Sequence, residues 1–243
     1  MLALESEHNA DLFAVLCNSL LRELAEASSA ASAIDISLNH LRRWKAFLAN
    51  RNARLLTAEE IRGLFAELWF LMELAGTPLG MDAAVFAWQG PDKIQQDFVF
   101  AGQAVEIKSL VSTDPRTFRI SSENQLDSAE PKLFLVTVLV SDNMNDEGRS
   151  LNDIAIEALA RPMSTDAQFQ LESKLAHSGY LPLDTYNKPR LKVDGAIAYE
   201  VAEGFPRLVR SGLPVGIIRV MYQIQLEHLA PFKCDFSRAL GGS

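Results

Sequence analysis

Residues 96–111 read QDFVFAGQAVEIKSLV, two apolar runs separated by the pair Ala101-Gly102. Apolar and polar side chains alternate in the second run, which is the period of a β-strand. Strand-forming residues on both sides of such a pair are typical of a tight hairpin. We therefore predict strands over 96–100 and 104–111.

Charged side chains occupy the middle of the second strand. Because side chains alternate across a strand, Glu106 and Lys108 project from one face and Ile107 from the other. Asp97 lies on the paired strand, and we expect its carboxylate to reach the Glu106 side. Two close carboxylates repel unless a cation lies between them. Mg²⁺ (or Mn²⁺) is a suitable cation, since Mg²⁺ takes one or two protein carboxylates with phosphate oxygens and water.

Lys108 beside such a metal could position the attacking water and stabilise charge on a reacting phosphate. The alternative interpretation is a solvated hairpin face. An Asp followed by Glu-x-Lys at this spacing occurs in many proteins by chance, so the pattern alone leaves both interpretations open.

The preceding helix contributes a third carboxylate. Thr57 and Glu60 form a capping-box pattern, which predicts a helix start at residue 57. We expect the helix to close at Gly76, just before a proline. At about 100° per residue, Glu67 falls on the shoulder of the apolar stripe and Glu73 falls well away from it. Glu67 is thus a candidate metal ligand, or else a boundary residue that packs only its methylenes.

The rest of the chain predicts one α/β domain over residues 1–243. Its parts are a helical N-terminal layer (1–56), a core (57–141) and C-terminal helices and strands (142–243). In the N-terminal layer we expect a helix capped by Asn9, a loop over 27–33 and a helix over 38–48. Further expected elements, in chain order, are a strand over 118–121, a short helix over 122–127, a strand over 133–141, helices over 151–160 and 164–176, and strands over 191–201 and 215–229.

Composition excludes several classes of protein. The 243 residues carry 31 acidic and 23 basic side chains, a net charge of −8. This acidic balance argues against a protein that grips nucleic acid on its own. The longest apolar stretch, Phe134 to Val140, is too short to cross a membrane. Cys17 and Cys234 form no paired motif and suit a reducing cytoplasm, where we expect the protein.

Five sequence blocks carry a more specific likeness: Arg62 to Leu71, Trp88 to Pro91, Asp97-Phe98, Val105 to Ser109 and Ile120 to Leu126. In this order they resemble one prokaryotic branch of the PD-(D/E)XK nuclease superfamily, over about residues 11–232. Members of that branch resemble restriction enzymes and often belong to defence loci beside methyltransferases and ATPases. The likeness implies a restriction-endonuclease-like mixed β-sheet flanked by helices, and metal-dependent hydrolysis of DNA.

The resemblance also implies roles for single residues. Asp97 and Glu106 match the metal-binding acidic pair, and Lys108 matches the catalytic lysine. Glu67 matches the acidic residue of the first core helix. Gln125 matches a motif glutamine that follows the third strand and lies near the active site.

Two features depart from the family pattern. Gln96 replaces the proline that often precedes the motif aspartate, and the chain starts almost at the first helix. Any target-recognition module would then lie elsewhere or on a partner protein. A catalytically silent subunit that binds nucleic acid or protein is the alternative function. A homodimer would suit cleavage of both DNA strands. The best basic candidates for phosphate contacts are Arg116, Arg119, Lys188, Arg190 and Lys192.

Overall fold

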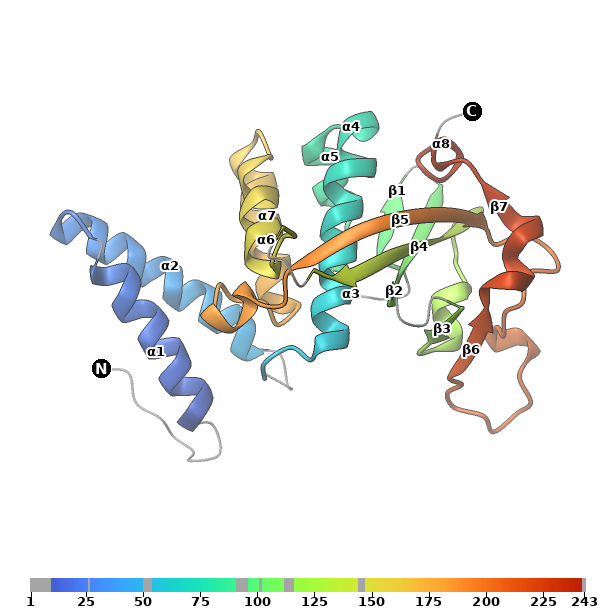
Figure 1. Cartoon of the computed structure of the whole chain (residues 1–243), viewed down its shortest axis with the longest axis horizontal. Helices are drawn as coiled ribbons and strands as arrows, with labels where there is room; N and C mark the ends of the chain where they lie inside the picture. Colours follow the sequence, from blue (N-terminus) through green and yellow to red (C-terminus); the bar gives the residue numbers. More distant parts are fainter. Residues whose placement is uncertain are drawn as a thin grey trace.

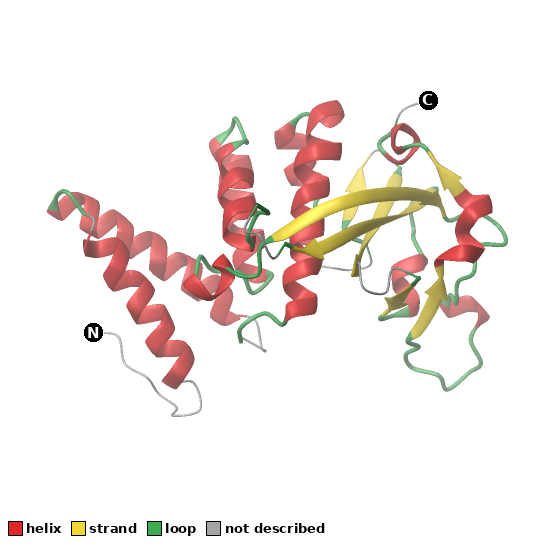
Figure 2. Cartoon of the chain, in the orientation of Figure 1, coloured by secondary structure: helices red, strands yellow, loops and turns green. Residues whose placement is uncertain are grey.

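The computed structural model describes residues 10–25, 27–49, 54–90, 96–100, 102–111, 116–143 and 147–241. A twisted sheet lies at the centre, helices pack beside it, a helical hairpin projects at one end and a small second sheet lies at the other (Figure 1). Helices and strands are largely segregated along the long axis (Figure 2). None of the helices in the described ranges is long and apolar enough to cross a bilayer.

The main sheet is mixed, as the sequence predicts. Its five strands follow the order β1-β2-β4-β5-β7. The pair β2–β4 is parallel and every other neighbouring pair is antiparallel. The strands are β1 (Phe98–Phe100), β2 (Gln103–Val111), β4 (Lys132–Asp142), β5 (Leu191–Glu200) and β7 (Lys233–Cys234).

A second, two-stranded sheet stands apart from the first. It pairs β3 (Thr117–Ile120) with β6 (Tyr222–Gln225) in antiparallel register. The strand expected over 118–121 is therefore real, but it pairs outside the main sheet. The short 3-10 turn η4 (Glu123–Leu126) follows it and confirms the short helix expected over 122–127.

Helices cover one face of the main sheet. Val105 and Ile107 of β2 and Phe134 of β4 pack in one apolar core with residues of these helices. The opposite face, with Ala104 and Leu110, packs in a second core with β3, β6 and the segment after β6. The helices of the first layer are α3 (Ala58–Trp69), the π-helical segment η2 (Phe70–Ala75), α4 (Gly76–Leu79), α5 (Met81–Ala87), α6 (Leu151–Ala160) and α7 (Thr165–His177).

The N-terminal layer is more helical than expected. It consists of α1 (Ala10–Ala25) and α2 (Ala30–Ala49). The predicted loop over 27–33 is confirmed for 27–29 and wrong for 30–33, because Ser29 Oγ accepts a hydrogen bond from the Ser32 N–H at 3.1 Å and α2 starts at Ala30. The alanines that follow then favour helix. The predicted cap Asn9 lies outside the described residues.

Two more element boundaries differ from expectation. The third helix does not close at Gly76, whose φ of −63° continues the helix, but at Gly80, whose φ is 81°. The strand expected over 215–229 shrinks to β6, since Gly216 has a φ of 99° and breaks the extended run. After β6 the chain forms the 3-10 helix η7 (Leu226–Phe232).

Besides α5 and the two-residue strand β7, three short helical elements have no counterpart in the sequence prediction. They are η5 (Asp184–Asn187), η6 (Arg210–Gly212) and α8 (Phe236–Ala239). Each spans a single turn, too short for hydrophobic periodicity to register. Cys17 and Cys234 are both free thiols.

Candidate active site

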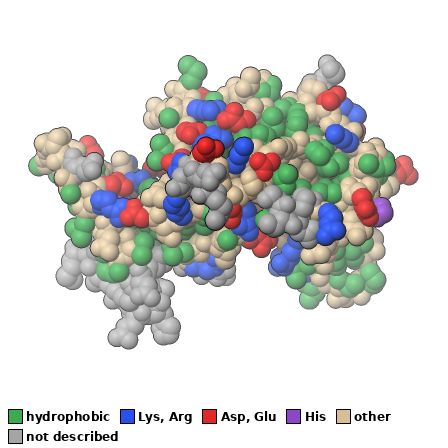
Figure 3. All heavy atoms as spheres, viewed as in Figure 1, with side chains coloured by type: hydrophobic (Ala, Val, Ile, Leu, Met, Phe, Trp, Pro, Cys, Tyr) green, Lys and Arg blue, Asp and Glu red, His purple; other side chains and the backbone are tan. Residues whose placement is uncertain are grey.

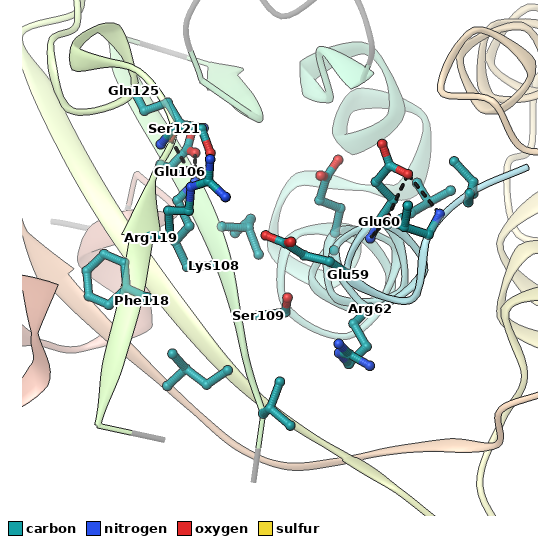
Figure 4. A pocket seen from close by; sticks show the side chains of 18 of the residues that line it. Glu59, Glu60, Arg62, Glu106, Lys108, Ser109, Phe118, Arg119, Ser121 and Gln125 are labelled. Carbon is teal, nitrogen blue, oxygen red and sulfur yellow. Dashed lines mark hydrogen bonds and ion pairs between the residues drawn. The ribbon is translucent and has the colours of Figure 1, made fainter. Parts of the chain in front are cut away.

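The open edge of β2 borders a cavity. Within the described residues, β1 pairs only with the first three residues of β2, from Gln103 to Val105. From Glu106 onward this edge faces a hollow of about 980 Å³ between β2, β3 and the start of α3. Figure 4 shows Glu106 and Lys108 on one side of the hollow and Glu59 and Arg62 of α3 on the other.

Glu106, Lys108 and Gln125 form a connected polar group on the β2 side. Lys108 Nζ lies 2.8 Å from Glu106 Oε1 and donates a hydrogen bond of 3.0 Å to Gln125 Oε1. The Glu106 side chain is 2% exposed and that of Lys108 is 14% exposed. A buried carboxylate costs free energy unless a cation or hydrogen-bond donors compensate it. The Lys108 ammonium compensates the Glu106 charge, and Lys108 itself lines the cavity wall.

The η4 turn is fixed in place from two sides. The Ser121 N–H donates to Gln125 Oε1 at 2.8 Å, so the oxygen that accepts from Lys108 is itself oriented by backbone. Gln96 Nε2 donates to the carbonyl oxygens of Asn124 and Asp127 at 3.0 and 3.1 Å. Gln96, which stands where the family often has proline, therefore joins the turn to the strand that begins at residue 98.

Asp97 lies behind the cavity rather than on its wall. It is buried, and its Oδ2 accepts the Ile107 N–H at 2.7 Å. Extending the β1–β2 register by one residue from Phe98–Val105 places Asp97 opposite Glu106, as the hairpin predicts. Its carboxylate thus contacts the backbone of β2 between the two charged side chains.

Glu67 reaches the cavity from α3. It is buried, it lines the hollow with Glu106 and Lys108, and its Oε2 accepts the indole N–H of Trp88 at 2.9 Å. The helix-face prediction is confirmed, since Glu73 lies outside the cavity and near Arg161, with 3.4 Å between Glu73 Oε1 and the guanidinium. Trp88 entered the sequence analysis only as the start of a motif block, although a buried indole N–H usually finds an acceptor.

The carboxylates suit a hard divalent cation. Glu106 and Glu67 both present oxygens to one cavity, and Glu106 already contacts a cationic group. Oxygen donors of this kind are those that Mg²⁺ and Mn²⁺ prefer. No three His, Cys, Asp or Glu side chains in the described ranges gather as a metal cage. A metal here would therefore rest on the one or two protein carboxylates that are usual for Mg²⁺.

Four arginines surround the hollow, and only one of them was predicted. Of the five basic candidates from the sequence, Arg119 lines the cavity, and Arg190 instead pairs with Asp153 on α6. Arg116, Lys188 and Lys192 are not among the lining residues. The further cations come from distant segments that no local pattern connects: Arg54, Arg62 and Arg219.

The start of α3 supplies an acid of the cavity wall whose pKa is strongly lowered. The Arg54 guanidinium donates two hydrogen bonds of 2.8 Å to Glu60 and lowers the pKa of that carboxyl to about 2. The Thr57 N–H and hydroxyl donate to the same carboxylate. Glu60 is thereby a permanently charged cap of α3.

Comparison with known proteins gives one match. A family model described as "Putative PD-(D/E)XK family member, (DUF4420)" matches residues 1–227. No curated protein and no solved structure gives a significant match. The matched region contains all five predicted site residues and both apolar cores up to the end of β6.

Proposed function

This chain belongs to that family of PD-(D/E)XK proteins, and we propose that it is a Mg²⁺- or Mn²⁺-dependent DNA endonuclease. Membership confirms the superfamily predicted from the motif blocks, and the mixed sheet flanked by helices fits its restriction-endonuclease-like fold. The family points to a nuclease. The metal, the DNA substrate and a role in restriction or phage defence are our proposal.

The contact between Glu106, Lys108 and Gln125 carries the proposal. A partly buried lysine and a buried glutamate, two residues apart on a strand edge, face a polar cavity instead of packing in a core. Burial of charged groups costs free energy, so a pair that faces a cavity is a candidate for function. Glu106 and Lys108 on β2 also match the acidic residue and the lysine of the motif for which the family is named.

Glu106 and Glu67 would hold the metal from the cavity wall. Asp97, which lies behind that wall and opposite Glu106 across the hairpin, would add an oxygen from the β1 side, as the motif match implies. When bound, the metal supplies positive charge for the phosphate oxygens and lowers the pKa of water. Trp88 fixes the Glu67 carboxylate through its indole N–H. The Ile107 N–H fixes Asp97 in the same way. Two of the three candidate ligands, Glu67 and Asp97, are therefore oriented by hydrogen-bond donors other than Lys108.

Lys108 would act on the reacting groups. Its ammonium has three donors, of which Glu106 and Gln125 take two. The third can orient the attacking water or a phosphate oxygen. In the reaction the water oxygen bonds to phosphorus, the bond from phosphorus to the ester oxygen breaks, and a proton reaches that leaving oxygen. Gln125 keeps Lys108 in place during this exchange.

The cations around the cavity support a polyanionic substrate. Arg54, Arg62, Arg119 and Arg219 line the hollow. Arginine binds phosphate with planar, paired N–H groups. Four glutamates, Glu59, Glu60, Glu67 and Glu106, line the same hollow, so the arginines supply local positive charge for phosphates in a chain whose net charge is −8.

Partners from a defence locus are also part of the proposal. The acidic balance favours the alternative function, a silent subunit that binds nucleic acid or protein in a defence complex. A homodimer would let two copies cut the two strands of a duplex. Light scattering of the purified protein, alone and with DNA, tests the dimer.

Cleavage of supercoiled plasmid in Mg²⁺ and in Mn²⁺ tests the enzyme. We expect nicked and linear products with the wild type, and their loss in Glu106→Ala. Glu73→Ala is the matched control, because it removes a carboxylate from the same helical run as Glu67 but outside the cavity. No cleavage by wild type, with or without its genetic neighbours, would favour the silent subunit.

A further inference from the structure

Residues 206–221, here named the arginine loop, have a charge opposite to that of the whole chain. The loop contains Arg207, Arg210 and Arg219 and no acidic residue, whereas the chain has a net charge of −8. It leads into β6 and hangs below the second sheet (Figure 1). The family motif set does not include it.

The tip of the arginine loop is apolar and open to solvent. Val215 is 106% exposed, Ile218 is 86% exposed and Met221 is 57% exposed. Figure 3 shows hydrophobic side chains gathered at this end of the molecule, with basic side chains next to them. Large apolar side chains are rarely left so exposed together without a binding partner.

The base of the loop is held firmly. Arg210 Nη1 donates to the carbonyl oxygens of Ile217 and Ile218 at 2.7 and 3.0 Å and so closes the loop on itself. The Val220 N–H donates to Glu123 Oε2 at 3.0 Å. This bond and the neighbouring Arg210 lower the pKa of Glu123, which therefore stays charged. These hydrogen bonds hold the base of the loop in place below the exposed apolar tip.

The same contacts, together with those of Arg219, connect the loop to the cavity. Glu123 belongs to the η4 turn that carries Gln125. Arg219 Nε and Nη2 donate to the Ser121 carbonyl oxygen at 3.1 and 3.0 Å, and Arg219 lines the cavity. The loop that presents the tip is therefore joined to the cavity wall through Arg219 and the η4 turn.

Two of the arginines keep their positive charge available. Arg207 donates to the Leu126 carbonyl oxygen at 2.6 Å, and Arg219 donates to that of Ser121. In the parts of the chain that the structure describes, neither forms an ion pair. A carbonyl orients a guanidinium without neutralising it, so both can still attract an anion.

We propose that the arginine loop binds duplex DNA beside the cavity, with its arginines on the phosphates and its apolar tip wedged against the bases of the minor groove. Proteins that bend DNA combine these same two features, basic contacts and an apolar wedge that unstacks a base step. The proposal rests on the nuclease function for its choice of DNA. A membrane surface also attracts basic apolar loops, but it would not account for the braced connection to the cavity.

Fluorescence anisotropy with a labelled duplex at low salt, in EDTA, tests the loop without any cleavage. We expect the double variant V215S/I218S to bind about tenfold more weakly or worse, since it removes the wedge. The control I156S removes an isoleucine that is 60% exposed on α6 and should bind like wild type. The tip is solvent-exposed, so melting temperatures should agree among the three proteins.

Salt dependence isolates the arginines. R219Q should reduce the slope of log affinity against log salt by about one, the contribution of a single phosphate contact. The control R42Q removes the same charge from α2 and should leave the slope unchanged. A duplex with 2-aminopurine should brighten on binding the wild type, because unstacking relieves quenching, and should stay dim with V215S/I218S.

The outcomes separate this proposal from the nuclease function. Loop-dependent binding without cleavage would support the loop and contradict the nuclease. Cleavage that V215S/I218S leaves unchanged, with unchanged binding, would overturn the loop and keep the nuclease. Absence of duplex binding by wild type would overturn the loop. Loop-dependent sedimentation with phosphatidylserine vesicles, together with loop-independent DNA binding, would overturn it in favour of a membrane.

Discussion

The two walls of the cavity use the same kinds of residue in different surroundings. On the α3 wall Arg54 and Glu60 form a paired contact in which the glutamate side chain is 43% exposed. On the β2 wall Lys108 and Glu106 form a similar contact in which the glutamate side chain is 2% exposed. Water solvates the charges of the first pair, whereas protein groups compensate the charges of the second pair.

This difference in burial separates stability from chemistry. An exposed ion pair contributes about 0–1 kcal/mol and can be replaced by many other surface pairs. A buried pair costs several kcal/mol to desolvate, and apolar residues of equal size often stabilise a fold as well or better. We infer that the β2 pair serves catalysis and that the α3 pair serves the helix start. Substitutions on the β2 wall should then lower the cleavage rate, and substitutions on the α3 wall should lower the free energy of unfolding.

The largest effect should follow from Lys108→Ala. Removing the ammonium takes away the group that orients water or phosphate, and we expect cleavage to fall by roughly 10²- to 10⁴-fold. Single-turnover cleavage rates measure this loss. Because the variant also removes the ammonium that lies 2.8 Å from the buried Glu106 carboxylate, a double variant Glu106→Gln/Lys108→Met should regain stability while it stays inactive. An active double variant would break the distinction between the walls.

Substitution of Gln125 should have the next largest effect on cleavage, because Gln125 positions Lys108. Gln125→Ala removes the acceptor that holds Lys108, and we expect cleavage to fall by about 10- to 100-fold. Gln125→Glu keeps an oxygen for both Lys108 and the Ser121 N–H, so most of the activity should return. If both variants lose activity equally, Gln125 does not act by holding Lys108.

Substitution of Trp88 should affect the stability of the fold more than it affects cleavage. Trp88→Phe keeps most of the ring but removes the N–H that Glu67 accepts in a buried site, which we expect to cost about 1–3 kcal/mol. Urea unfolding measures the free energy. In Glu67→Gln background the loss should be smaller, because a neutral amide needs its partner less. Equal losses in both backgrounds would mean that lost packing explains the effect.

The smallest effect should come from Glu60 and should depend on pH. The Arg54 contact lowers the folded-state pKa of Glu60 to about 2, from an ordinary value of 4.5. A lowered carboxyl pKa stabilises the fold above pH 4.5, and this contribution is lost as the pH falls towards 2. Glu60→Gln keeps a capping-box residue, so it should cost less than about 1 kcal/mol at neutral pH because the pair is exposed.

The cost of Glu60→Gln should disappear as acid unfolding curves approach pH 2. Arg54→Gln should show the same pH dependence, since it removes the other half of the pair. A cost that stays constant between pH 5 and pH 2 would mean that charge is not the cause.

Local patterns predicted the hairpin, the cap of α3 and the placement of Glu67, because each depends on residues a few positions apart. The Thr57 capping box and the alternation around Glu106 are of this kind. Contacts between distant segments left no such pattern. Arg219 reaches Ser121 at the cavity across 98 residues, and Trp88 reaches Glu67 across 21 residues because the chain turns back between α3 and α5.

The strand predicted over 215–229 failed for a related reason. Its alternating apolar residues satisfied the strand period, but they form the exposed tip of the arginine loop and not a buried face. Periodicity reports burial only when the segment packs. The motif blocks placed Gln125 near Lys108, and no pattern in the sequence showed that Ser121 would orient it.

The central claim is that the carboxylates beside Lys108 hold a divalent metal. Melting curves of wild type and Asp97→Asn, in EDTA and across a Mn²⁺ titration, test it without knowledge of the DNA target. Asparagine keeps the shape of Asp97 and an oxygen for the Ile107 N–H. A metal that binds only the folded state adds about 2.7 kcal/mol at 100 times its dissociation constant. We predict a rise in melting temperature for wild type that is mostly lost in Asp97→Asn, and an equal rise in both proteins, or none in either, would contradict the claim.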